Sequence, residues 1–264
     1  MNIATFPGFL NAACSRPKPD TITLRFAAAN PTQGGFTITD TVTVKSTYNG
    51  EPHTETYPAG TTSISFNADA DTDVIIIGSV TSFSCANANI LFSSIIINSS
   101  SINEFISDYS GQYNHTIQSI EINSESLTRL QAQYLDNLNN LSVVSRSLLN
   151  IDLQYDTILE EFNGENCQGI KYLDTNGALA ISVLNLSNST DILSFNHSAP
   201  PQAYGFTRIY YRATNQSAAN DVANVISKCD ATDGVVYLNS DDTYYQTVAD
   251  AATAKGWTIE ALPA

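Results

Sequence analysis

The stretch Leu127-Thr128-Arg129-Leu130 is one of six short boxes in which two apolar residues are separated by two others. The boxes recur at steps of 21 to 25 residues: Val80 with Phe83, Ile102 with Phe105, Leu127 with Leu130, Leu148 with Ile151, Ile170 with Leu173, and Ile192 with Phe195. A second series lies between them: Ile117 with Ile120, Leu141 with Val144, Leu159 with Phe162, and Ile181 with Leu184. A period of about 22 residues is typical of leucine-rich repeats.

The period has a direct physical meaning. A single coil of this length cannot bury its apolar face, but stacked coils align their boxes into one core and a ladder of parallel strands. Asn or Ser usually follows a box, and Asn in the turns is expected to hydrogen-bond free backbone groups along the stack. The alternative is an ordinary β-protein in which apolar residues recur by chance. The regular steps favour a leucine-rich-repeat-like solenoid over residues 79–204.

In the part of the chain before the boxes, apolar residues recur with a period of two. Residues 1–20 contain three prolines and predict an irregular N-terminal arm. From Thr21 onward, apolar residues alternate with polar ones, and turns are expected at Pro31 to Gly35, Asn49-Gly50 and Pro58-Ala59-Gly60. Short strands at this spacing predict a small β-sandwich of immunoglobulin-like topology over residues 21–78.

The chain after the boxes mixes helices and strands. Residues 215–228 place small and branched apolar residues on one helical stripe, and strands are expected at 206–212, 235–238 and from Trp257. Ser240 or Asp241 is expected to cap a second helix, which ends at Gly256. Residues 205–264 therefore predict a β-α-β-α-β cap over the end of the stack. The expected fold class is mainly β with minor α.

One stretch resembles a known repeat family. Residues 74–85, VIIIGSVTSFSC, resemble the start of BspA-like leucine-rich-repeat regions, and Leu127 to Leu130 and Ile170 to Asp174 fit the same repeat. The resemblance covers roughly residues 74–200, although many Leu positions hold Ile, Val or Phe. Proteins with such regions are surface proteins of gut bacteria and virion proteins of their phages. The resemblance therefore implies a binding or structural role and no enzymatic activity.

Composition limits the classes of partner. Eleven Lys and Arg stand against 26 Asp and Glu, for a net charge of −15, so neither nucleic acid nor an anionic membrane is an expected partner. No apolar run is long enough to span a bilayer, and the N-terminus lacks the features of a secretory signal. The four cysteines, Cys14, Cys85, Cys167 and Cys229, are too dispersed for a metal site and are expected to be buried thiols.

No motif predicts chemistry. The three histidines, His53, His115 and His197, lie outside any nucleophile or zinc motif, and the spacing of Asp69, Asp71 and Asp73 does not continue as an EF-hand. We therefore expect no enzyme activity, no cofactor and no metal.

Tyrosines near the repeats are the expected interface, because Tyr combines apolar area with a polar tip. They are Tyr109, Tyr113, Tyr134, Tyr155 and Tyr172. The alternative is that these side chains pack on the core.

With repeats of a surface type and no export signal, the leading hypothesis is a phage virion component. It would be a capsid-attached decoration or fibre protein that contacts other virion proteins and takes part in host attachment. A bacterial cell-surface adhesin or glycan-binding module is the alternative, and homo-oligomerisation is plausible by the symmetry of assemblies.

Overall fold

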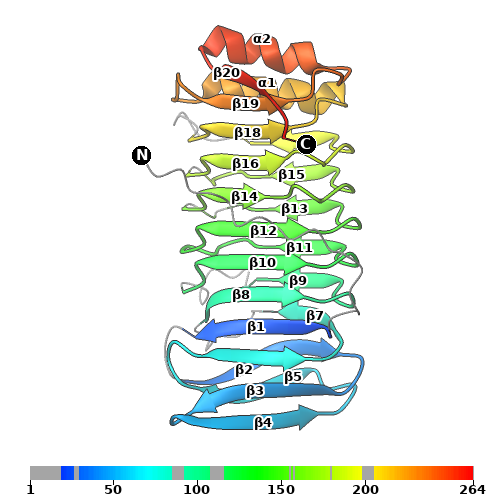
Figure 1. Cartoon of the computed structure of the whole chain (residues 1–264), viewed down its shortest axis with the longest axis vertical. Coiled ribbons are helices and arrows are strands. Elements are labelled where there is room, and N and C mark those ends of the chain that lie inside the picture. The colour runs from blue at the N-terminus through cyan, green and yellow to red at the C-terminus, as the bar shows by residue number, and fades with distance from the viewer. Residues whose placement is uncertain are drawn as a thin grey trace.

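The chain folds into an elongated stack of short strands with two helices at its C-terminal end (Figure 1). The structure is a computed structural model. The structure describes residues 19–26, 30–84, 92–107, 116–154, 156, 158–178, 180–197 and 205–263. Of residues 30–37 it describes the backbone alone. The predicted N-terminal arm therefore lies almost wholly outside the described residues. The expectation of a mainly β fold with minor α is confirmed.

The strands form two sheets. Sheet A contains, in spatial order, β20 (Thr258–Ala261), β19 (Val235–Leu238), β18 (Arg208–Tyr211), β16 (Val183–Leu186), β14 (Glu161–Asn163), β12 (Asn140–Val144), β10 (Ser119–Asn123), β8 (Phe92–Asn98), β1 (Thr21–Phe26), β6 (Asp73–Ile77), β3 (Val42–Tyr48) and β4 (Glu51–Tyr57). Sheet B contains β17 (Ser194–Asn196), β15 (Tyr172–Asp174), β13 (Asn150–Asp152), β11 (Arg129–Gln131), β9 (Glu104–Ile106), β7 (Val80–Ser84), β2 (Asn30–Ile38) and β5 (Ser63–Ala68). From β7 to β17, consecutive strands alternate between the two sheets.

The six boxes of the sequence occupy one column of sheet B. The second apolar residues of the boxes are buried and stand in register as direct neighbours: Phe83, Phe105, Leu130, Ile151, Leu173 and Phe195. The first residues of the boxes are buried as well. All these strands pair in parallel, so the predicted ladder of parallel strands is confirmed. The step of about 22 residues is the length of chain between one strand and its neighbour in the sheet.

The second series lies in sheet A, with one correction. Ile120, Leu141, Phe162 and Leu184 are the buried neighbours in register. The sequence aligns Val144 with Phe162, but Val144 is half-exposed and Val143 is buried. The reason is that β12 alternates with a period of two, so Leu141 and Val143 share its inner face.

Backbone hydrogen bonds between successive coils continue beyond the strands into the corners, the turns that join one sheet to the other. The carbonyl groups of Asn103, Asn139 and Lys171 each accept two backbone N–H groups from the following coil. Buried serines add to this pattern: Ser124 Oγ donates to Ile102 O at 2.8 Å, and Ser189 Oγ donates to Cys167 O at 2.9 Å. The sequence predicts asparagines in this role, and the structure corrects that prediction, because serines donate these bonds between coils.

Asparagines in the turns act locally instead. Asn163 Oδ1 accepts from the N–H of Glu165 at 3.1 Å, and Asn185 Oδ1 accepts from the N–H of Ser187 at 3.1 Å. Each closes an Asx turn, which reverses the chain as a coil leaves sheet A.

The first strands pair antiparallel and extend both sheets. Strand β1 lies between β6 and β8, so residues 21–26 are hydrogen-bonded to both sides of the predicted boundary at residue 78. The Asn49-Gly50 turn is confirmed, with φ of 54° and 75°. The turn predicted at Pro31 to Gly35 is wrong, because these residues belong to β2. There the backbone pairing of Gly34 and Gly35 with β5 overrides the turn preference of glycine.

Gly78 lies where the chain passes from sheet A to sheet B. Its φ is 130°, and a Cβ there would stand 3.0 Å from both Thr41 O and Val42 Cγ1. Only glycine fits both the backbone conformation and the space.

The C-terminal cap follows the predicted order of elements. Helix α1 (Gln216–Lys228) begins at the N-cap Asn215, and helix α2 (Tyr245–Lys255) ends at Gly256 in the left-handed region, as predicted. The predicted capping of α2 by Ser240 or Asp241 is wrong. The helix starts later, after Tyr244, without a side-chain cap. Helix α1 packs against β17 and α2 packs on α1.

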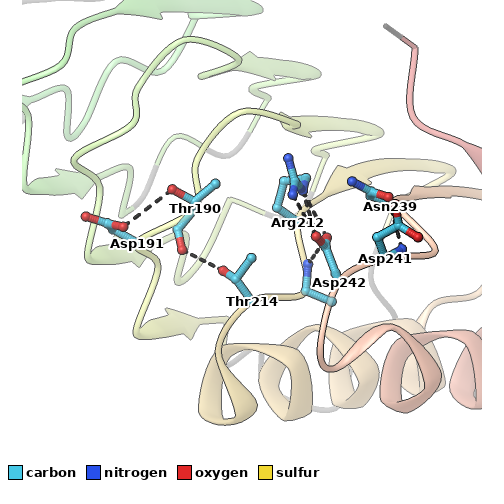
Figure 2. A network of polar contacts seen from close by, with 8 residues as sticks. Thr190, Asp191, Arg212, Thr214, Asn239, Asp241 and Asp242 are labelled. Atoms are coloured by element: carbon cyan, nitrogen blue, oxygen red, sulfur yellow. Dashed lines mark hydrogen bonds and ion pairs between the residues drawn. The ribbon is translucent and has the colours of Figure 1, made fainter.

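A buried ion pair joins β18 to the loop before α2 (Figure 2). Asp242 accepts from Arg212 Nε at 2.9 Å and Nη2 at 2.7 Å, and from the N–H of Ala213 at 2.8 Å. The carboxylate is 2% exposed, whereas the guanidinium is 27% exposed. Nearby, Thr214 Oγ1 donates to the carbonyl of Thr190, so the chain leading into α1 is tied to the preceding coil.

Asp20, which directly precedes β1, ties this part of the chain to the turn after β8. Its Oδ2 accepts from Ser99 Oγ at 3.0 Å and Ser101 Oγ at 2.6 Å, and its Oδ1 accepts from the N–H of Ser100 at 2.9 Å. Burial opposes the charge, but these hydrogen bonds together lower the pKa of Asp20 below its ordinary value.

We expect Asp20→Asn to lower the free energy of unfolding at pH 7 by about 1 kcal/mol, a value kept small by solvent screening. A lowered folded-state pKa stabilises the fold above the unfolded pKa, and this contribution disappears as pH falls through the folded value. The difference from wild type in urea unfolding should therefore shrink near pH 3. The exposed Asp40→Asn serves as control. An equal loss at both pH values contradicts this account.

We expect Asp242→Ala to lower the free energy of unfolding by about 3 kcal/mol, because it leaves the Arg212 guanidinium partly buried without its partner. Amide hydrogen exchange should show lost protection in α1 and α2. Arg25→Ala is the control, since the Arg25–Asp73 pair is about half exposed on both sides and should change stability by less than about 1 kcal/mol. Equal effects of the two variants would refute the structural role of the buried pair.

Candidate functional site: a groove on the outer face of sheet B

The outer face of sheet B carries two columns of side chains. Because the middle residue of each short strand is buried, the residues before and after it face away from the core. The first column is Glu104, Arg129, Asn150, Tyr172 and Ser194, and the second is Ile106, Gln131, Asp152, Asp174 and Asn196. The last three rows line a groove of about 450 Å³, which Asp221 of α1 borders.

The second column is a ladder of carboxylates and amides. Gln133 Nε2 donates to Asp152, and Gln154 Nε2 donates to Asp174 Oδ2 at 3.0 Å. Asn196 Nδ2 reaches the same Asp174 oxygen at 3.0 Å. The backbone N–H groups of Gln154 and Asn176 donate to the remaining carboxylate oxygens. Neutral donors therefore hold both carboxylates in place, and no cation takes part among the described residues.

Asp174 is close enough for its negative charge to act on Asp152. Burial, reinforced by the negative charge of Asp174, raises the pKa of Asp152 above its ordinary value, against the opposing effect of the Gln154 N–H. The groove is thus a site of unfavourable negative charge, kept in position by the fold.

Helix α1 closes this end of sheet B. Asp221 Oδ2 accepts from the N–H of Phe195 at 3.0 Å, so a helix carboxylate takes the backbone donor that a further strand would otherwise pair with. The same helix supplies one wall of the groove.

The first column leaves polar groups free for a ligand. Within the described part of the chain, the side chains of Asn150, Tyr172 and Ser194 make no hydrogen bond to protein. Tyr172 is 52% exposed. The chain entering these strands adds the exposed Leu149 and Leu193, which flank Lys171 in the stack. Leu149 and Leu193 precede Asn150 and Ser194 in the chain, but they are not among the residues that line the groove.

The structure places two of the five tyrosines predicted as an interface. Tyr172 lies in the groove. Tyr134 lies half-buried in the turn after β11, with φ of 61°, and does not line it. Tyr109, Tyr113 and Tyr155 lie outside the described residues.

Sequence reasoning missed the carboxylate column, although a signal was present. Asp152, Asp174 and Asn196 each follow the second apolar residue of a box, so they recur with the same step as the core. The contribution of Asp221 had no such signal, because it depends on how α1 docks.

Other titratable groups are arranged for structure. His197 is buried, Thr175 Oγ1 lies 2.7 Å from its Nδ1, and burial lowers the pKa of His197 to about 4. His53 lies on the exposed strand β4, and His115 lies outside the described residues. Asp156 is fully buried and accepts from the N–H of Leu135, and burial raises its pKa well above the ordinary value.

Cys167 and Cys229 are buried free thiols, as predicted, and burial raises the pKa of each to about 12. Cys14 and Cys85 are outside the described residues.

The described residues contain no group of three or more His, Cys, Asp or Glu side chains arranged to hold a metal ion. Among the described helices, neither is long and apolar enough to cross a bilayer.

Comparison with known proteins adds no relative: no protein-family model, curated protein sequence or solved structure matches the chain. The resemblance to BspA-like repeats therefore stays a prediction.

We expect Asp174→Asn to lower the pKa of Asp152 toward its ordinary value, because it removes the neighbouring negative charge and leaves the burial. Titration of the Asp152 carboxyl by NMR measures this. The pKa of Glu161, which burial raises on the other sheet, should not move. An unchanged Asp152 titration would mean that Asp174 does not act on it.

Proposed function

We propose that the chain is a non-enzymatic structural and interaction protein, a phage virion component of the capsid-attached decoration or fibre type. The observation that carries this proposal is the groove on sheet B. The fold positions its carboxylates with neutral donors, and leaves Asn150, Tyr172 and Ser194 without protein partners. A side chain that faces solvent in an ordered groove is suited to recognition, since the fold holds it in place before binding.

The finer fold assignment belongs to the same proposal. We take residues 79–204 as a leucine-rich-repeat-like solenoid of BspA-like type, supported by boxes that stack in register at steps of 21 to 25 residues. We take the N-terminal strands as an immunoglobulin-like sandwich. Its support is the presence of four antiparallel strands in sheet A facing three in sheet B. In this arrangement the N-terminal end would dock onto a particle and the repeats would project.

A bacterial cell-surface adhesin or glycan-binding module is the second candidate. The exposed ring of Tyr172 in the groove favours it, because exposed apolar groups next to polar ones are typical of binding surfaces. Homo-oligomerisation fits either candidate.

The location of the native protein tests the proposal. We expect quantitative mass spectrometry to recover the chain with density-purified phage particles at a fixed ratio to the capsid protein. Host envelope fractions from uninfected cells are the control. Recovery in the envelope alone would refute the virion assignment and support the adhesin.

A further inference from the structure

We propose that the groove lined by Asn150, Tyr172, Ser194, Asp152, Asp174 and Asn196 binds a neutral oligosaccharide. This inference rests on the proposed function as an interaction protein, and names the chemical class of its ligand. The volume of about 450 Å³ falls within the range of small-ligand sites, roughly 300–1,000 Å³.

Tyr172 supplies the stacking surface. Its ring is about half exposed and stands at the centre of the first column, between Asn150 and Ser194. The C–H face of a sugar ring packs against such an aromatic ring, because the ring face is electron-rich and the C–H bonds are weakly positive.

The two columns offer complementary hydrogen-bonding groups. Tyr172 and Ser194 hydroxyls and the Asn150 amide are free to donate or accept. The opposite column presents Asp152 and Asp174, whose oxygens keep unused acceptor capacity because each carboxylate has about four lone-pair sites. Vicinal sugar hydroxyls donate and accept at once, so a sugar lying between the columns can pair with both sides.

The spacing of the columns suits a chain of sugar rings. Neighbouring strands are about 4.8 Å apart, and side chains on one face of a strand repeat every ~6.7 Å. Three rows from β13, β15 and β17 therefore present a surface two to three sugar rings long, bounded by Asp221 at the α1 end.

Charge selects the class of ligand. Asp152, Asp174 and Asp221 line the groove and no described Lys or Arg does, the neighbouring cation Arg129 standing one row away beside Asn150, so a sulphated or sialylated glycan would be repelled. A basic peptide would be attracted by the same carboxylates, although five amide and backbone N–H donors already take up part of their acceptor capacity, so the test includes such a peptide as the competing ligand. The donor-bound carboxylates and the exposed ring together favour a neutral polyhydroxylated ligand.

The test measures binding by the whole purified chain. A printed array of neutral glucose, mannose, galactose and N-acetylglucosamine oligosaccharides is compared with sialylated and sulphated ones and with a hexalysine peptide. Isothermal titration then gives the Kd for the best neutral hexasaccharide. Tyr172→Ala should weaken it by about tenfold or more, and Tyr172→Phe, which keeps the ring, by only a few fold. Ser194→Ala removes one free hydroxyl and leaves the ring of Tyr172 in place, and it should also raise the Kd.

Tyr237→Ala, on the outer face of sheet A, is the matched control and should leave the Kd unchanged. Circular dichroism confirms that each variant is folded. Three results would each overturn the proposal: no neutral oligosaccharide bound at millimolar concentration, binding that survives Tyr172→Ala, or binding of hexalysine alone. None of them bears on recovery with phage particles, so this inference can fail while the virion assignment stands.

Discussion

Hydrogen bonding between successive coils is the constraint on which this fold depends. Strands of three residues cannot hold themselves together, and each gains its backbone partners from the coil before it and the coil after it. The corner carbonyl groups that accept two N–H groups continue this pairing outside the strands. Register is preserved only if every coil returns the same residue to the same place, and Phe105, Leu130 and Ile151 align in this way along sheet B.

Much of the fold could be predicted because it follows from periodicity. The boxes that contain Phe83 and Leu173 gave the order of sheet B, and the apolar stripe of α1 gave its position. What failed depended on contacts distant in sequence. Gly34 and Gly35 carry a turn signal, yet pairing with strands on both sides decides their conformation. Val144 has the right residue type for the core, and only the pairing of β12 shows that it faces outward.

The candidate site was predictable in part for a similar reason. Tyr172 was found because aromatic residues beside repeats are a general sign of an interface. Asp152 and Asp174 look like solvated turn residues when the chain is taken alone. They form part of the groove because they lie side by side on neighbouring strands of sheet B, where the amides of Gln133 and Gln154 orient them. That arrangement requires two neighbouring coils, and no single stretch of sequence contains it.

The repeating step has a consequence for how such a protein can change over generations. Each coil between β7 and β17 meets chiefly the coils on either side, so an in-frame duplication of one unit of about 22 residues could be accommodated without redesigning the core. Each added unit would lengthen the body by about 4.8 Å and add one row to the outer face of sheet B. Length and the number of rows on this face are therefore heritable traits that vary together, with the two differently built ends left unchanged.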